Sequence, residues 1–175
     1  ILYNPVDTHR FRPVPRPPGP LTLLLGGSRY QEYPVELALR PLALVRRERP
    51  STRLIVSGAL TFSADGDRIV AALIRELAIG DAVELVGPYT RAEAPALLQR
   101  ADILLHPKVN DPCPTTVLEA MACGVPVVYS ATGGTPGLVG DRGGVGVPGP
   151  LDWDHDPLPA PSELAAAVVR VAESL

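Results

Sequence analysis

Short apolar runs alternate with longer amphipathic patterns along most of this chain of 175 residues. The apolar runs predict six buried strands, at Leu21–Leu25, Arg53–Ser57, Ala82–Val86, Ile103–Leu105, Val125–Tyr129 and Val145–Val147. The amphipathic patterns predict helices at Pro34–Glu48, Asp65–Ile79, Arg91–Arg100, Pro114–Ala122 and Ser162–Ser174. Such alternation is typical of βαβ units. We therefore expect a doubly wound, Rossmann-like α/β domain, with a parallel sheet of about six strands and helices on both faces.

Prolines set the expected limits of the domain and of its first helix. Pro13–Pro20 reads PVPRPPGP, which is typical of a stiff, extended linker. Residues 1–20 are therefore predicted to be an interdomain linker, and residues 21–175 a single domain. Pro41 falls inside the first predicted helix and should kink or split it, because proline removes a backbone hydrogen bond.

Charge and cysteine content narrow the classes of partner. The formal net charge is −3, and no basic run suggests a nucleic-acid-binding surface. Cys113 and Cys123 lack the paired spacing of metal ligands, so we expect no metal, and buried thiols in a reducing cytosol. No signal peptide or membrane-spanning run is visible, which favours a cytoplasmic location.

The stretch Asn110–Pro126, NDPCPTTVLEAMACGVP, carries the clearest chemistry. Pro114, Thr115 and Thr116 are predicted to form the first turn of a helix, whose free amides can bind an anion. Glu119 shares the helix face of the two threonines, and its carboxylate should lean toward the bound anion. A phosphate beside a carboxylate that can grip a vicinal diol is what recognition of a nucleotide sugar requires.

The same stretch resembles the signature of retaining glycosyltransferases with the GT-B fold, family 4 (glycosyl transferases group 1). That family carries Glu, seven residues, Glu and then Ala-Met-Ala-Cys-Gly-x-Pro-Val, which LEAMACGVPVV at Leu118–Val128 matches closely. NPVDTHRF at Asn4–Phe11 resembles the family's interdomain linker, and Val83–Pro107 its base-binding loop, helix and following strand. GGTPGLVGDRGGVGVP resembles its glycine turn near the donor. The resemblance covers nearly the whole chain and implies the C-terminal, donor-binding half of such an enzyme.

The resemblance implies three catalytic residues. Asp111 stands where the family's first acid contacts the donor sugar, although it is shorter than the expected Glu by one C–C bond, about 1.5 Å. The family's Arg and Lys, which clamp the diphosphate, fall at Gly27 and near Glu32 in this chain. Arg29 and Lys108 are therefore the candidate cations, because a guanidinium or ammonium can still reach the phosphates from either position.

The resemblance also implies a nucleotide-sugar site assembled from several loops. A carboxylate on a helix would bind the ribose, and the amides of the first helical turn would bind the distal phosphate. Two pairs of glycines would let the backbone approach the donor. The loop after the third strand would form the base pocket. These residues are Glu119; Thr115, Thr116 and Val117; Gly26 and Gly27; Gly133 and Gly134; and Gly87, Pro88 and Tyr89.

The implied activity is transfer of a sugar from a UDP-, GDP- or ADP-linked donor to an acceptor, with retained anomeric configuration and no metal or other cofactor. A missing N-terminal domain would bind the acceptor, so the chain alone should not turn over. Peripheral membrane contact through that missing half, at the inner membrane face, stays open.

Two other functions remain open. A non-catalytic half-domain that acts as a binding or interaction module is favoured by the missing Arg and Lys, and by Gly137 in place of a late acid. A sugar-nucleotide epimerase on the same fold has less support. GGSRYQ lacks the G-x-G-x-x-G pattern, which disfavours a dinucleotide oxidoreductase, and the absence of a P-loop motif excludes a P-loop nucleotidase.

Overall fold

The computed structural model of the chain describes residues 3–27, 31–150, 154, 156 and 158–175. Its strands are β1 (Thr22–Leu25), β2 (Arg53–Ser57), β3 (Val83–Val86), β4 (Ile103–His106), β5 (Val127–Ser130) and β6 (Gly144–Val147). Its helices are α1 (Tyr33–Val45), α2 (Gly66–Glu76), α3 (Ala94–Leu98), α4 (Thr115–Ala122), α5 (Thr135–Val139) and α6 (Pro161–Ala172), with a 3-10 turn η1 (Gly80–Ala82). Each strand lies within two residues of its predicted range.

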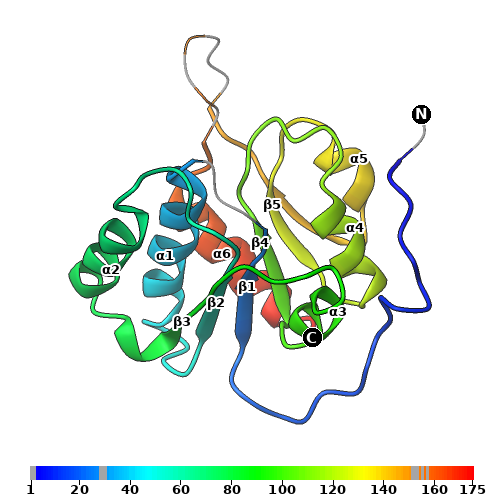
Figure 1. Cartoon of the computed structure of the whole chain (residues 1–175), viewed down its shortest axis with the longest axis horizontal. Coiled ribbons are helices and arrows are strands. Elements are labelled where there is room, and N and C mark those ends of the chain that lie inside the picture. The colour runs from blue at the N-terminus through cyan, green and yellow to red at the C-terminus, as the bar shows by residue number, and fades with distance from the viewer. Residues whose placement is uncertain (1–2, 28–30, 151–153, 155, 157) are drawn as a thin grey trace.

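The six strands form one parallel sheet in the order β3-β2-β1-β4-β5-β6 (Figure 1). The chain first moves outward from β1 to β3 and then returns to the other side of β1, where β4 begins the second half. The predicted doubly wound α/β fold is thus confirmed. The order reverses between β1 and β4, and ligands of such sheets bind outside the carboxyl ends of the strands at this switch point.

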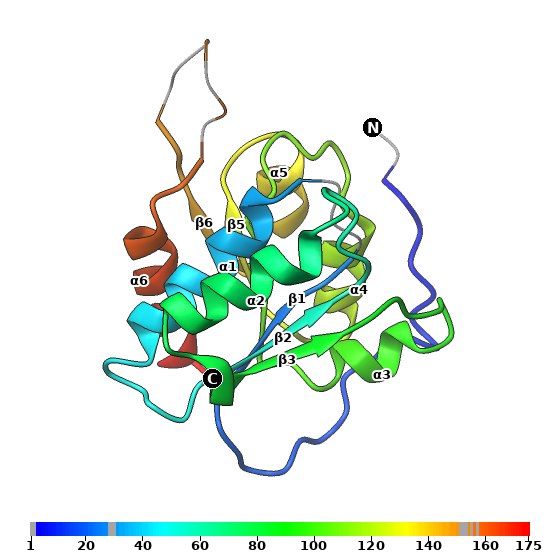
Figure 2. The same ribbon diagram turned by 60° about the vertical axis from the view of Figure 1, so that its left-hand side comes forward.

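Each face of the sheet has its own apolar core, because successive strand residues point to opposite sides. Leu23 and Leu25 of β1 belong to the core under α1, α2 and α6, whereas Leu24 between them belongs to the core under α3 and α4. Figure 2 shows α1, α2 and α6 on one side of the sheet and α4 on the other. Helices therefore cover both faces, as predicted.

The first helix does not break at its proline. α1 runs unbroken from Tyr33 to Val45, so the predicted split at Pro41 is wrong. Pro41 is buried, and its neighbours Leu39 and Leu42 are fully buried in the core shared with the sheet and α6. Tertiary packing supplies most helix stability in proteins and here outweighs the missing hydrogen bond.

The short helix α5 replaces what was expected to be a glycine turn. Pro136 lies in its first turn, where a proline costs no hydrogen bond, and Gly140 with φ of 58° follows its last residue. Five residues are too few for a recognisable helical period, so sequence patterning could not reveal this element.

The N-terminal segment, residues 3–20, contains no helix or strand but lies along the domain. Phe11 is only 2% exposed and belongs to the core under α3 and α4. The Gln99 side-chain amide donates to the Arg12 carbonyl at 3.0 Å, and the Arg16 guanidinium pairs with Asp102. In Figure 1 this segment, in dark blue, descends beside α4 and α3 and crosses below the sheet to β1.

Candidate functional site

Three loops meet at the switch point between β1 and β4. Gly26 and Gly27 follow β1, residues 107–114 connect β4 to α4, and residues 131–134 follow β5. A Cβ atom added to Gly26 would lie 3.0 Å from Cγ2 of Thr116, so the β1 loop packs directly on the first turn of α4. Gly27 has φ of 90°, a conformation that side chains other than glycine rarely adopt. The sheet order thus brings together predicted site residues that are far apart in the sequence.

The start of α4 leaves two backbone amides at its open end. Pro114 is the N-cap residue with an extended backbone (φ −67°, ψ 109°), so the helix begins at Thr115 rather than at the proline. The Val117 amide donates to the Pro114 carbonyl at 3.1 Å, and the Val117 side chain is fully buried. Of the three amides predicted to bind phosphate, Val117's is therefore used within the helix, while those of exposed Thr115 and half-buried Thr116 precede the first intrahelical bond.

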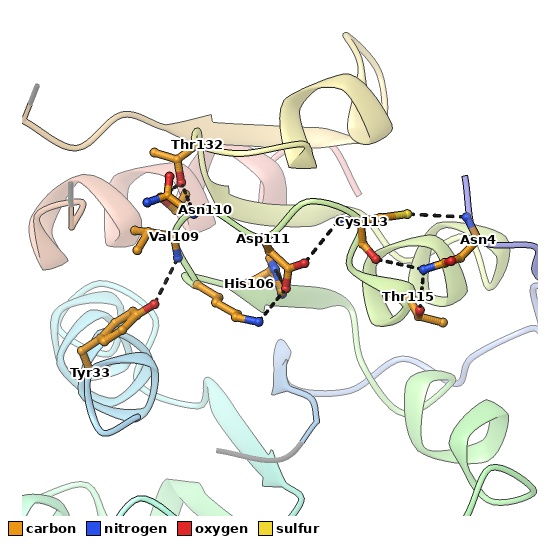
Figure 3. Close-up of polar contacts among 11 residues, drawn as sticks. Asn4, Tyr33, His106, Val109, Asn110, Asp111, Cys113, Thr115 and Thr132 are labelled. Carbon is orange, nitrogen blue, oxygen red and sulfur yellow. Dashed lines mark hydrogen bonds and ion pairs between the residues drawn. The ribbon is translucent and has the colours of Figure 1, made fainter. Parts of the chain in front are cut away.

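The Asp111 carboxylate lies close to Lys108 of its own loop and to His106, the last residue of β4 (Figure 3). Its Oδ2 lies 3.0 Å from Nζ of Lys108 and 3.7 Å from Nε2 of His106. Its Oδ1 accepts a hydrogen bond from the Cys113 amide at 3.3 Å. The Asp111 side chain is only 13% exposed, whereas Lys108 is 51% exposed. Lys108, predicted as a phosphate cation, is in this structure the ion partner of Asp111.

Hydrogen bonds from two other elements fix the loop that carries Asp111. The Val109 amide donates to the Tyr33 hydroxyl of α1 at 3.2 Å, and the Asn110 amide donates to Oγ1 of Thr132 at 2.9 Å (Figure 3). Burial raises the pKa of the Tyr33 hydroxyl, so the hydroxyl stays protonated at neutral pH, as an ordinary tyrosine does. Asn110 adopts a φ of 56°, a conformation that asparagine tolerates better than most residues.

Gly133 and Gly134 are required by the packing of this loop. A Cβ on Gly133 would lie 2.7 Å from the Asp111 carbonyl oxygen, and one on Gly134 would lie 2.0 Å from that of Pro112. The Gly134 amide donates to the Asp111 carbonyl at 2.9 Å. The close backbone approach that was predicted toward a donor sugar is thus made, in this structure, to residues 110–112 of the chain itself.

Glu119 lies half-buried on α4, toward the loop that precedes α3. Burial raises the pKa of its carboxyl group, and the positive charges of Arg91 and Arg10 act in the opposite direction. The Arg10 guanidinium donates to the Arg91 carbonyl at 3.1 Å, which ties the N-terminal segment to the same loop. Half-buried Tyr89 packs against the core on this face of the sheet.

Surface pockets lie at both ends of the sheet. Gly87 and Pro88 are exposed and line a pocket of about 330 Å³ at the carboxyl ends of β2 and β3, together with Gly58 and Asp67. A larger groove of about 610 Å³ lies between residues 14–20 and the amino ends of the strands, away from every predicted site residue. We place the candidate site at the carboxyl ends, because the predicted residues and the switch point coincide there.

Some site residues lay beyond the reach of sequence patterns. Asn4, Tyr33 and Thr132 contact the site through partners distant in the sequence, and no local motif signals such contacts. Arg29, a predicted cation, lies outside the described residues. Among the residues that the structure describes, no group of three His, Cys, Asp or Glu side chains is placed to hold a metal ion, and no helix is long and apolar enough to cross a membrane.

Known structures share this fold. The C-terminal domain of a glycosyl transferase group 1 family protein from Francisella tularensis superposes with a TM-score of 0.78 at 16% identity, over 97% of this chain and 88% of that one. The Anabaena protein HepE, in complex with UDP-glucose, gives a TM-score of 0.75 at 22% identity, over 98% of this chain and 47% of that one.

Comparison of the sequence with known proteins identifies the family of the chain. D-inositol 3-phosphate glycosyltransferase of Mycobacterium marinum is 32% identical over 168 residues, which are 89% of this chain and 34% of the relative. Its counterpart from Salinispora arenicola is 32% identical over 127 residues, 70% of this chain and 28% of the relative. The chain thus spans about a third of the length of these relatives. Residues 7–155 match the sequence profile of the family described as glycosyl transferases group 1. This chain, with its doubly wound GT-B half-domain fold, therefore belongs to the glycosyl transferases group 1 family.

Proposed function

We propose that this chain is the donor-binding domain of a retaining glycosyltransferase of family 4, and that a part of the protein outside this chain binds the acceptor. The observation that carries the proposal is the meeting of Gly26, Asp111 and the first turn of α4 at the switch point. The length of the relatives supports a separate acceptor-binding part, because this chain spans about a third of them.

The donor would lie along the carboxyl ends of the strands. The amides of Thr115 and Thr116 would bind the distal phosphate, because the start of a helix carries open donors and a partial positive charge. The Glu119 carboxylate would accept hydrogen bonds from the ribose hydroxyls, and the base would lie against the loop at Gly87–Tyr89. HepE holds UDP-glucose on the same fold, which makes UDP the first nucleotide to test against GDP and ADP.

Transfer breaks the bond between the anomeric carbon and the diphosphate oxygen and joins that carbon to an acceptor oxygen on the same face. The proton of the acceptor hydroxyl leaves with the diphosphate, so atoms and charge balance without a metal or other cofactor. The anomeric carbon becomes positive and the diphosphate more negative along this path. Asp111 would stabilise the positive charge on the anomeric carbon. The start of α4, together with Arg29 or Lys108, would stabilise the negative charge on the diphosphate.

Calorimetric titration of the chain with UDP, GDP and ADP tests the donor site. We expect selective binding of one nucleotide and at least tenfold weaker binding by Glu119→Ala, since a charged hydrogen bond contributes about 1.5–3 kcal/mol. Glu163→Ala, an exposed glutamate of α6, is the matched control and should bind as the wild type does. Absence of nucleotide binding by the wild-type chain would refute the proposal.

A second candidate, a non-catalytic module, is favoured by one observation. Lys108 is paired with Asp111, and Gly27 occupies the position of the expected cation. Few cations are therefore left to bind the diphosphate. Transfer by the full-length protein separates the two functions. An enzyme loses transfer in Arg29→Ala or Lys108→Ala, whereas a binding module shows no transfer in any variant.

A further inference from the structure

The side chain of Asn4, in the N-terminal segment, contacts the open end of α4. The Asn4 amide nitrogen Nδ2 lies 3.2 Å from the carbonyl oxygen of Cys113 and 3.3 Å from Oγ1 of Thr115. The Asn4 backbone amide also donates to Sγ of Cys113 at 3.5 Å. Figure 3 shows the Asn4 side chain beside Cys113 and Thr115, with dashed lines from its amide nitrogen to both. Asn4 and Thr115 are 111 positions apart in the sequence.

The chemistry of these contacts fixes the direction of each hydrogen bond. A carbonyl oxygen only accepts, so the Asn4 group that faces Cys113 must be the NH₂ and not the amide oxygen. Its second N–H then points to Thr115, whose hydroxyl oxygen accepts it. A hydroxyl has one proton and two lone pairs, so Thr115 keeps its proton for donation to another group. The exposed end of α4, with the Thr115 amide, is where that proton can be used.

We propose that Asn4 is a positioning residue for the phosphate-binding end of α4, acting through the Thr115 hydroxyl. Asn4 occupies one lone pair of Thr115, which orients the hydroxyl proton toward the anion beside the helix start. The inference rests on the proposed function, because the anion is the distal phosphate of the donor. It adds a residue from the N-terminal segment to a site otherwise built from loops of the sheet.

The rest of the segment holds Asn4 in place. Phe11 is buried under α3 and α4, and Arg10 donates to the Arg91 carbonyl at 3.1 Å. Asn4 itself is exposed, so replacing it removes its hydrogen bonds without opening the core. The effect of Asn4 on the helix start can therefore be measured in a folded chain.

The test compares a nucleoside diphosphate with the monophosphate of the same nucleoside, for whichever base the wild-type chain binds. We expect Asn4→Ala to weaken diphosphate binding by about 3- to 10-fold, the range for a partly lost hydrogen bond to a charged group, and to leave monophosphate binding unchanged. Thr8→Ala, an exposed position of the same segment, is the control and should change neither affinity. A purely structural role for Asn4 would weaken both ligands alike and would overturn the inference.

A double-mutant cycle shows whether Asn4 acts through Thr115. Thr115→Val removes the hydroxyl but keeps the shape of the side chain, and Asn4→Ala should have no further effect on diphosphate binding in that background. Additive losses would overturn the inference. If the wild-type chain binds diphosphates and Asn4→Ala binds them equally well, the inference alone fails. If the wild-type chain binds none, the proposed donor site fails and the inference fails with it.

Discussion

Glu119 is a proposed ligand-binding acid, but its carboxyl group is half-buried on a helix, where a negative charge is unfavourable. Burial raises the pKa of its carboxyl group above 4.5, and Arg91 and Arg10 offset only part of that shift. A carboxylate held in this way costs folding free energy but is ready to accept hydrogen bonds from a ligand. Perturbed acids of this kind cluster at functional sites, which agrees with its proposed contact to the ribose.

Glu119→Gln should stabilise the fold at pH 7 while weakening nucleotide binding. A carboxyl group whose pKa is raised by folding contributes stability below its unfolded pKa, and that stability is lost as pH rises through the folded pKa. The advantage of the glutamine variant should therefore appear above about pH 4.5 and vanish below it. Calorimetric Tm values at pH 4 and pH 7 measure this difference.

Glu163→Gln, on the exposed side of α6, serves as the control for removal of a surface charge. A glutamine variant of Glu119 with the same change in Tm at both pH values would show that burial of the charge has no influence on stability.

Two connecting loops, after β4 and after β5, are packed backbone to backbone, and this contact places Asp111. The Gly134 amide donates to the Asp111 carbonyl at 2.9 Å, and the Asn110 amide donates to Thr132. Hydrogen bonds from the loop after β5 therefore hold the loop after β4 in position. The geometry of the candidate acid therefore depends on a glycine that contacts the backbone of Asp111.

Gly134→Ala should destabilise the chain by about 3 kcal/mol, because its Cβ would lie 2.0 Å from the Pro112 carbonyl oxygen and the backbone would have to move. Urea denaturation measures this loss. Gly87→Ala is the matched control, since a Cβ on Gly87 meets no atom within 4 Å. The control should change stability by less than about 0.5 kcal/mol. Equal stability of the two variants would mean that the loops do not brace each other.

At the scale of the whole molecule, the N-terminal segment belongs to the folded unit. Its Phe11 ring is buried in the core under α3 and α4, and Arg16 pairs with Asp102 just before β4. The segment runs from the open end of α4 to the start of β1 and so spans the height of the sheet (Figure 1). Residues of this segment therefore pack against the domain, and the assignment of residues 1–20 to an interdomain linker stays a prediction.

Phe11→Ala should lower the free energy of unfolding by about 3 kcal/mol, the usual cost of emptying a buried phenylalanine site. Chemical denaturation of the 175-residue chain measures it. Val14→Ala, in the same segment but 39% exposed, should cost less than about 0.5 kcal/mol. A truncated chain without residues 1–20 should show at least the loss of the Phe11 variant. If the truncated chain were as stable as the full chain, the segment would contribute nothing to the stability of the domain.

The sequence by itself determined the strands, most helices and the chemical character of α4. The six apolar runs were recognisable because burial on both faces of a parallel sheet leaves a local hydrophobic signal. The stretch that contains Glu119 was recognisable because its spacing is a property of one helix. The family likeness, confirmed over residues 7–155, rests on the same contiguous motifs.

Only the tertiary structure decided which distant residues meet. The sheet order puts β1 beside β4 and thereby Gly26 against Thr116. Core packing keeps α1 intact through Pro41, and the course of the N-terminal segment brings Asn4 to Thr115. Hydrophobic patterning acts over a few residues, whereas these contacts depend on how whole elements bury their surfaces against one another. The contiguous motifs could therefore be recognised in the sequence, whereas the contacts that join distant residues could not.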